Sequence, residues 1–301
     1  MNRNMPKKAL KWAGIAFGGL VGVIVIILVV LYFVGGSRVN KTYDIEVASV
    51  AVSNEAGAIE RGRHFVEAIA LCQECHGENL AGDVLEDSFL FGEIMPSNLT
   101  SGKGGVGGAY TDADFARAIR HGITRQGKGI IIMPSEQYNV FGDEDLGAII
   151  AYLRSLPPVD NELPKTSVGP LARLIALLDS SIIAAQVIDH TAPRRPSPTP
   201  GVTPEYGEYL ATICTLCHGD DFGGGPVPDD RNVFAPNITQ GGTPGTWSEA
   251  DFINTIRTGV TPGRNQLDEE NMPWNRFRLM TDDELRAIWS FLSSLPAVPP
   301  G

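Results

Sequence analysis

Two five-residue stretches decide how this chain is interpreted: Cys72-Gln73-Glu74-Cys75-His76 and Cys214-Thr215-Leu216-Cys217-His218. Together they use all four cysteines of the 301-residue sequence, and a glycine follows each histidine. Two cysteines three positions apart lie close together on one helical turn, so their sulfurs can bond to the same group. The histidine that follows is held by that same turn. The pattern therefore predicts two matching sites, each with two sulfurs and one imidazole.

This spacing is typical of covalent haem attachment, in which each cysteine sulfur adds to a haem vinyl group and the histidine ligates the iron. We therefore predict two covalently bound haem c groups. A shared four-cysteine zinc site is disfavoured because the two pairs are 142 residues apart in separate repeats. A disulfide within each pair would leave the histidines unexplained. The predicted haem-binding residues of the two motifs are Cys72, Cys75, His76, Cys214, Cys217 and His218.

The two motifs lie at equivalent points of an internal repeat, which runs from about Asn54 to Leu156 and again from about Thr203 to Leu295. Each copy is predicted to begin with a short helix that leads into its motif. The first copy has three more residues before its cysteine. Each copy closes with an amphipathic helix that ends before a proline. Between them, Ser97-Asn98-Leu99-Thr100 matches Pro236-Asn237-Ile238-Thr239. The repeat predicts two similar domains.

Three of the expected helices begin with a capping box, in which a hydroxyl residue is followed three positions later by an acid. Gly122 and Gly259 stand where two of these helices are expected to end, since glycine adopts the left-handed conformation of a C-cap. The three pairs are Thr111 with Asp114, Ser248 with Asp251, and Thr281 with Glu284.

The sixth ligand of each iron is predicted from the repeat. Of the six methionines, only Met133 and Met272 occupy corresponding positions, and each precedes a proline. The proline favours an extended backbone at the methionine. A methionine in a core merely fills space well, but the paired Met-Pro sequences favour iron ligation. We therefore predict His76 with Met133 and His218 with Met272 as the metal-ligand pairs.

The remaining histidines outside the motifs, His64, His121 and His190, do not recur in the other half, and we interpret them as ordinary surface or structural residues. Other side chains do recur, and they are candidates either to bind haem propionates or to pack the repeat. These recurring pairs are Tyr110 with Trp247 and Arg120 with Arg257.

The N-terminal region contains a predicted membrane span. Residues Trp12 to Val34 include no charged side chain, and these 23 residues exceed the roughly 20 that cross a bilayer core. The basic residues before the span place the N-terminus in the cytoplasm and the rest of the chain outside. The run is longer than the h-region of a cleaved signal peptide. A second apolar stretch, Leu171 to Ile188, is too short and too polar for a span. We expect it to form a helix packed between the domains, with a helix at the membrane surface as the alternative.

The net charge is −11, and removal of the basic first eleven residues leaves −15 for the rest. An acidic body argues against nucleic acid as a partner. It favours redox partner proteins with a basic docking face, although it is equally consistent with a face that only aids solubility.

Each half resembles a class I cytochrome c domain, with a helix into Cys-x-x-Cys-His, glycine-rich loops, a Met-Pro loop and a closing helix. The resemblance covers both repeats, about two thirds of the chain. It implies an all-α fold: an N-terminal transmembrane helix followed by two tandem class I cytochrome c domains. The expected parts are a cytoplasmic tip and anchor at 1–40, domain 1 at 54–157, a proline-rich linker with an apolar helix at 158–202, and domain 2 at 203–301.

The resemblance implies a membrane-anchored electron carrier with no catalytic residues of its own. It would transfer single electrons between respiratory or photosynthetic partners at the outer, periplasmic face of a bacterial inner membrane. One alternative is the cytochrome subunit of a membrane-bound dehydrogenase, in which the chemistry lies in another chain. A second is a diheme peroxidase, which requires a five-coordinate haem and is disfavoured by the paired Met-Pro loops.

Overall fold

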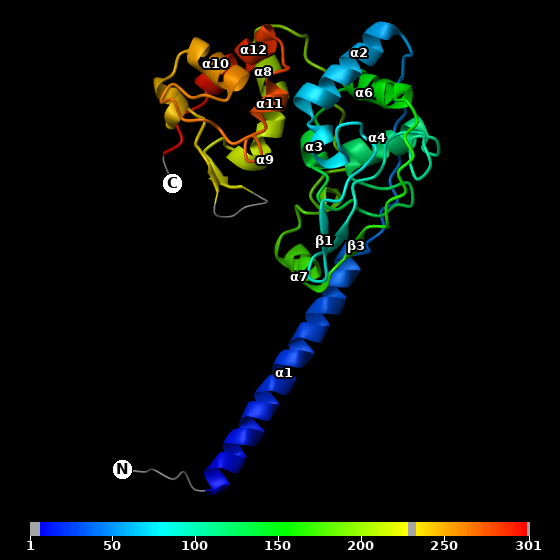
Figure 1. Ribbon diagram of the computed structural model, residues 1–301, viewed down its shortest axis with the longest axis vertical. Helices are drawn as coiled ribbons and strands as arrows, with labels where there is room; N and C mark the ends of the chain where they lie inside the picture. Colours follow the sequence, from blue (N-terminus) through cyan, green and yellow to red (C-terminus); the bar gives the residue numbers. More distant parts are fainter. Residues whose placement is uncertain (1–6, 228–232, 300–301) are drawn as a thin grey trace.

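The computed structural model describes residues 7–227 and 233–299. It has a long N-terminal helix, α1 (Lys7–Val39), that projects from a body of two helical lobes (Figure 1). The apolar part of α1, Lys11–Val39, is long and hydrophobic enough to cross a membrane, and none of its most hydropathic window is buried by the other described residues. The N-terminal repeat forms the lobe next to α1, and the C-terminal repeat forms the other.

The fold is mainly helical, as predicted, with two small antiparallel sheets that the sequence did not predict. The first lobe contains helices, a π-helical turn (η1) and two strands of a three-stranded sheet ordered β1-β2-β3. Its elements are α2 (Ala56–His64), η1 (Phe65–Ile69), α3 (Cys72–His76), β1 (Glu86–Ser88), β2 (Gly92–Ile94), α4 (Asp112–His121), α5 (Ser135–Tyr138) and α6 (Asp143–Ser155).

The second lobe repeats this order, with a two-stranded sheet in place of the three-stranded one. The segment between the lobes supplies β3 (Ser167–Val168), α7 (Pro170–Leu178) and the 3-10 turn η2 (Ala184–Gln186). The second lobe comprises α8 (Pro204–Ala211), η3 (Thr212–Cys214), α9 (Thr215–His218), β4 (Gly225–Pro226), β5 (Phe234–Ala235), η4 (Thr243–Thr246), α10 (Glu249–Thr258), α11 (Trp274–Phe277) and α12 (Asp282–Ser294).

In each lobe the first and last helices cross at a glycine. The helix α2 packs on α6 and α8 packs on α12, and these are the most extensive helix pairs in the body. A Cβ atom on Gly62 would lie 1.9 Å from the carbonyl oxygen of Ala148, and one on Gly207 would lie 1.9 Å from that of Ala287. Only glycine therefore lets the two backbones approach so closely. The equal geometry supports the common origin of the two halves that the sequence repeat indicates.

The predicted helix ends are confirmed. All three capping boxes form, with the hydroxyl accepting from the backbone N–H three residues later and the acid accepting from the cap N–H. Gly122 and Gly259 close α4 and α10 in the left-handed conformation, with φ of 63° and 70°. These local signals could be read from the sequence because they depend only on neighbouring residues.

The three additional residues of the first copy form a wider turn. In the first lobe α2 continues into η1, whose π-helical hydrogen bonding accommodates extra residues without breaking the helix. Leu71, with φ of 53°, then redirects the chain into α3. In the second lobe α8 passes directly through the tighter η3 into α9.

The expectation of an apolar helix at Leu171–Ile188 packed between the domains is wrong. The helix α7 ends at Leu178, and it packs against α1 rather than between the lobes. Asp179 ends the helix, because its side chain accepts locally from the N–H and the hydroxyl of Ser181. The following residues form a small core with the end of α1 and the first lobe, in which the buried members are Val39, Ile123, Ala176, Ile183 and Ala185.

The segment after α6 also belongs structurally to the first lobe. Asn98 Nδ2 donates to the carbonyl of Val159 at 2.8 Å, and β3 pairs with β2 through Gly92 and Val168. The first half of the predicted linker therefore packs against the first lobe and is not a flexible connection between the domains.

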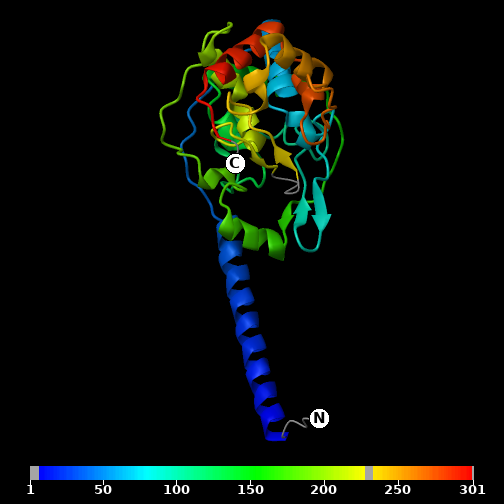
Figure 2. The ribbon, with the colours of Figure 1, turned by 90° about the vertical axis from the view of Figure 1, so that its left-hand side faces the viewer.

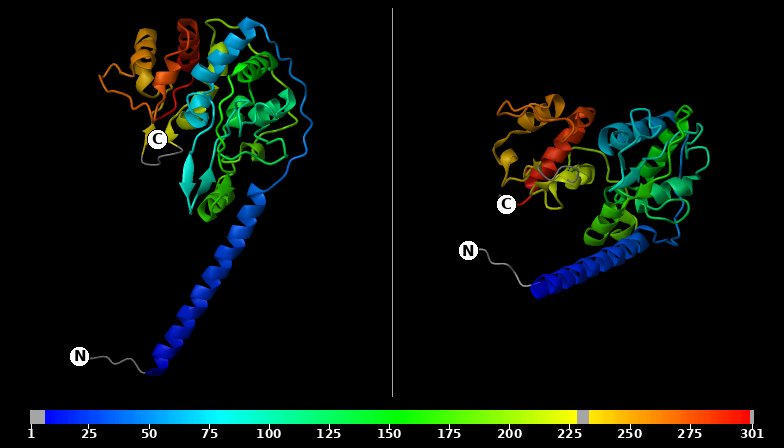
Figure 3. Two further views of the ribbon diagram at one scale, coloured as in Figure 1. Left: turned by 45° about the vertical axis from the view of Figure 1, so that its right-hand side comes forward. Right: turned by 60° about the horizontal axis from the view of Figure 1, so that its bottom comes forward.

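The two lobes share one continuous core. The buried Tyr209 hydroxyl donates to Asp145 at 2.5 Å, and Asp145 also pairs with Arg61, so three residues from both lobes join around one buried carboxylate. His64, in α2, bonds to both carboxylate oxygens of Glu284, in α12, at 2.9 Å. Contacts of this kind fix the relative orientation of the lobes that Figures 1 and 3 show.

Candidate functional site

The two cysteines of each motif lie on a single turn, α3 in the first lobe and α9 with its preceding residue in the second. All four are free of disulfides. Burial, with a contribution from the neighbouring cysteine, raises the pKa of Cys72 and of Cys214 to about 12. Both are therefore neutral thiols at neutral pH, which is the state expected of groups that are to form thioethers in an apolar site.

Each motif histidine is oriented by one backbone carbonyl. The Nδ1 atom of His76 donates to the oxygen of Ser97 at 2.7 Å, and Nδ1 of His218 donates to that of Pro236 at 2.8 Å. Burial lowers the pKa of both imidazoles, so each ring is neutral. A proton on Nδ1 leaves the Nε2 lone pair of each ring available for a metal.

The Asn-x-Thr pair after each accepting carbonyl explains why the sequence repeats there. Asn98 accepts from Thr100 and donates to Val159 O, while Asn237 accepts from Thr239 and donates to Val298 O at 2.8 Å. The loop that orients the histidine is thereby tied to the chain beyond the last helix of its lobe. Sequence reasoning aligned these residues but assigned them no role, and their recurrence was the available signal.

The two Met-Pro sequences adopt the same turn. Pro134 has φ −81° and ψ 55°, and Pro273 has φ −74° and ψ 56°, which is an inverse γ-turn centred on proline. In each case the methionine carbonyl accepts from the N–H two residues later, at 2.8 Å for Met133 and 2.6 Å for Met272. The turn leads into a short helix, α5 or α11. Both methionines are partly buried against the common core.

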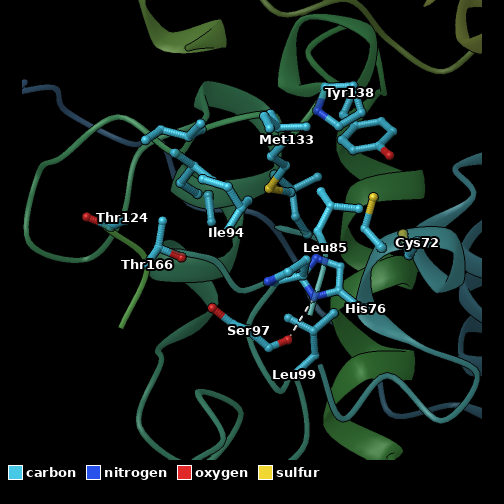
Figure 4. A pocket seen from close by; sticks show the side chains of 18 of the residues that line it. Cys72, His76, Leu85, Ile94, Ser97, Leu99, Thr124, Met133, Tyr138 and Thr166 are labelled. Atoms are coloured by element: carbon cyan, nitrogen blue, oxygen red, sulfur yellow. Dashed lines mark hydrogen bonds between the residues drawn. The ribbon is translucent and has the colours of Figure 1, made fainter. Parts of the chain in front are cut away.

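In the first lobe these parts surround one cavity of about 580 Å³. Cys72, Cys75, His76 and Met133 all line it, and Figure 4 shows His76 and Met133 reaching into it from different elements. Its other walls are mainly aliphatic and aromatic, from α4, α6 and the loops between. The volume falls within the range of about 300–1,000 Å³ typical of cofactor sites. Two thiols, a neutral imidazole and a thioether around an apolar space fit a haem.

Polar groups gather at the end of this cavity away from Cys72. Figure 4 shows Thr124 and Thr166 there, and Lys128 and Arg173 also line the cavity. Arg173 comes from α7, where its Nε donates to Val168 O at 3.0 Å. These cations and hydroxyls are the donors that a haem propionate would need. No sequence pattern singles out either cation, because Lys128 comes from a loop and Arg173 comes from the segment between the repeats.

In the second lobe several of the predicted residues are buried in or packed against the common core. Cys214, Trp247 and Met272 pack against its buried residues, and His218 is 6% exposed. The two sites also meet. We call the turn that carries the two cysteines of a motif its attachment turn. Ile213 and Leu216, at the attachment turn of the second lobe, line the cavity of the first lobe.

The remaining sequence candidates have structural roles. Arg120 donates to Phe141 O at 2.8 Å and pairs with Asp143, and Arg257 donates to Met280 O and pairs with Asp282. Arg120 therefore ties α4 to the start of α6, and Arg257 ties α10 to the start of α12, which favours the packing alternative over a propionate role. Tyr110 lines the first cavity. The histidines outside the motifs bond as structural residues, His64 to Glu284 and His121 to His190 at 3.1 Å between Nδ1 atoms.

Comparison with known proteins agrees with this arrangement. Residues 57–153 match the family model of cytochrome c oxidase, cbb3-type, subunit III, and residues 205–296 match the cytochrome c family model. A diheme cytochrome c-type protein of Cereibacter sphaeroides is 27% identical over 74% of this chain and 76% of its own length. The chain is a diheme c-type cytochrome. It has two cytochrome c domains and two covalently bound haem c groups.

Other relatives of this cytochrome are subunits of larger enzymes. The cytochrome c subunit of a quinone alcohol dehydrogenase of Gluconacetobacter polyoxogenes is 29% identical over 82% of the chain. The cytochrome subunit of a fructose dehydrogenase of Gluconobacter japonicus is 30% identical over 80%. The chain spans only 58% and 53% of the lengths of these two relatives.

Proposed function

We propose that this cytochrome transfers single electrons through its two haems as the cytochrome subunit of a membrane-bound dehydrogenase. The names of the fructose and alcohol dehydrogenase relatives favour this assignment over the free carrier that the sequence first favoured. The second candidate is an independent diheme carrier, supported by the Cereibacter sphaeroides relative, much of whose length the chain covers. Bound haem supplies a reversible one-electron change at iron.

We assign one haem to each domain, with domain 1 at 54–157 and domain 2 at 203–301. The assigned thioether residues are Cys72 with Cys75 and Cys214 with Cys217, and the assigned axial pairs are His76 with Met133 and His218 with Met272. The main support is the matched geometry: a neutral imidazole with its Nδ1 hydrogen-bonded and an inverse γ-turn at each Met-Pro. With a histidine and a methionine both bound, the iron would have no position open to substrate, so these residues would hold an electron carrier rather than a catalyst.

The contact between the lobes supports direct electron transfer from one haem to the other. Leu216 lies between the two cysteines of the second motif and also lines the first cavity. Conversely, Arg276 follows Met272 by four residues and reaches the first attachment turn, where it pairs with Glu74 at 2.7 Å. Gln137 follows Met133 by four residues and donates to Thr215, in the second attachment turn, at 3.3 Å. Each methionine loop thus contacts the other domain's attachment turn.

We assign the propionates of the first haem to the end of the cavity that Lys128 and Arg173 line. Arg173 also stacks over Tyr32 of α1, 4.5 Å from the ring centroid. This assignment lies on the side of the domain from which α1 emerges, so the first haem is the one nearer the membrane.

The remaining parts of the proposal concern location and partners. The apolar α1 supports anchoring in a bacterial inner membrane, and the basic residues before it support a periplasmic position for both haem domains. The acidic body, with −15 beyond the first eleven residues, favours partners with a basic docking face.

A redox titration of the purified holoprotein, followed by optical and magnetic spectra, tests the ligand assignment. Met133→Ala and Met272→Ala should each remove the methionine–iron charge-transfer band of one haem and lower its potential. Met280→Leu is the control, because Met280 is a buried core methionine outside the proposed sites. A high-spin or bis-histidine haem in the unaltered protein would overturn the assignment for that half. Co-purification with a flavin or quinoprotein subunit separates the dehydrogenase from the independent carrier.

A further inference from the structure

The first domain exposes an apolar hairpin tip beside the end of α1. Phe89, Leu90 and Phe91 form this tip between β1 and β2, and Phe89 is 87% exposed. Leu178, at the end of α7, is 82% exposed. Figure 2 shows the hairpin pointing toward the α1 end of the body, with α7 running across the axis of α1 at the same level. We call the hairpin tip together with Leu178 the apolar foot.

The apolar foot is rigidly attached to α1. The N–H groups of Gly169 and Leu171 donate to Phe91 O and Leu90 O at 2.8 and 2.9 Å, which fixes the hairpin to the start of α7. The helix α7 in turn meets α1 where a Cβ on Gly35 would lie 2.3 Å from Arg173 O. The position of the foot along α1 is therefore set by backbone contacts.

The level at which α7 meets α1 identifies what covers the foot. The predicted span in α1, Trp12 to Val34, has 23 residues and is about 35 Å long, slightly more than a bilayer core of about 30 Å. Gly35 and Tyr32 contact Arg173 of α7 at the end of this span, which the length of the span assigns to the level of the lipid headgroups. A tyrosine and an arginine stacked at that level suit the interface, where such side chains keep polar ends in water.

We propose that the apolar foot inserts into the outer headgroup region of the bilayer that α1 crosses, and so holds the first haem domain against the membrane. The occupant is lipid because the foot continues the lipid-facing surface of α1 at the depth where that surface ends. Insertion is limited to the tip, since Glu86 and Asp87 lie in β1 directly before it. The inference rests on the proposed anchoring by α1.

Spin labelling of the full-length holoprotein in phosphatidylcholine nanodiscs tests this proposal. The four native cysteines are assigned to thioethers, so a single introduced cysteine can be labelled. The variants are Phe89→Cys and Leu178→Cys for the foot, Val23→Cys within α1, and Ala56→Cys at the exposed start of α2, at the end of the body far from α1 (Figure 1). Power saturation with oxygen and with a water-soluble nickel chelate measures the depth of each label.

Labels at 89 and 178 should be several-fold more accessible to oxygen than to the nickel chelate, as at 23, while the label at 56 shows the reverse. The proposal is overturned if the labels at positions 89 and 178 are as accessible to the nickel chelate as the label at position 56, while the label at position 23 lies in lipid. Exposure of 23 to the chelate would instead refute the anchor itself, and the proposal with it. Unchanged haem spectra confirm that each variant is folded.

Discussion

The crossing of α2 and α6 makes Gly62 a sensitive position. In Gly62→Ala the new methyl carbon would lie 1.9 Å from Ala148 O and 2.4 Å from its carbonyl carbon, both backbone atoms that no rotamer change can move. The helices must separate. Overpacking of this kind lowers the free energy of unfolding by about 1–3 kcal/mol. The higher helix propensity of alanine offsets up to about 1 kcal/mol of this loss. We therefore expect a net loss of up to about 2 kcal/mol.

Gly57→Ala is the matched control, since Gly57 lies in the same helix and a Cβ there meets nothing within 4 Å. It should gain up to about 1 kcal/mol from propensity alone. For a domain of about 100 residues, 1 kcal/mol shifts the melting temperature by roughly 4–8 °C. Thermal unfolding of the detergent-solubilised holoprotein, followed by circular dichroism and by haem absorbance, should therefore separate the two variants by at least about 4 °C. Equal melting temperatures would refute the account of the crossing.

Three further predictions concern the interface and the histidine loops. Arg276→Met should remove the pairs with Glu74 and Glu78 and weaken the association of the lobes by about 1 kcal/mol. It should also slow electron equilibration between the haems, which flash photoreduction measures. An unchanged rate would contradict the proposed contact. Burial opposes ionisation of Glu284, but its hydrogen bonds with His64 and Thr281 outweigh burial and lower its pKa below 4.5. The carboxylate should therefore contribute its full stabilisation above pH 4.5, and this contribution should be lost as the carboxylate is protonated at lower pH. Glu284→Gln should flatten this acid limb in melts recorded against pH. Asn98→Ala should remove the acceptor of the Thr100 N–H and one of the two donors to Val159 O, at a cost of about 1–3 kcal/mol. It should shift the potential of only one haem, whereas Asn237→Ala should shift the other.

The sequence predicted what depends on near neighbours and on repetition. The attachment turns, the capping boxes and the two left-handed glycines are all defined within a few residues, and the repeat identified Met133 and Met272 as an equivalent pair. The inverse γ-turns explain why the two methionines could be matched from the sequence, since proline restricts the local backbone in the same way in both halves.

Features that depend on distant contacts could not be predicted. The apolar linker helix was misplaced because its hydrophobic face indicates burial but not the partner, and Arg173 meets Tyr32 and Gly35 from 138 or more residues away. Lys128 and Arg173 have no counterpart that the repeat could reveal. The pairing of Arg276 with Glu74 joins residues 202 positions apart, and neither local pattern nor charge alone selects that pair.

The differences between the two copies lie where the copies meet. The first lobe has the wider η1 turn, and α11 of the second lobe packs against it, while α5 of the first lobe packs against the tighter η3. The contact is thus reciprocal in position but unequal in shape and chemistry: Arg276 faces acids on one side, and Gln137 faces a threonine on the other. An arginine beside one attachment turn and a neutral amide beside the other give the two haems different electrostatic surroundings. Since potential depends on such surroundings, we expect the two haems to differ in potential, and we infer that this interface sets the direction of electron transfer between them.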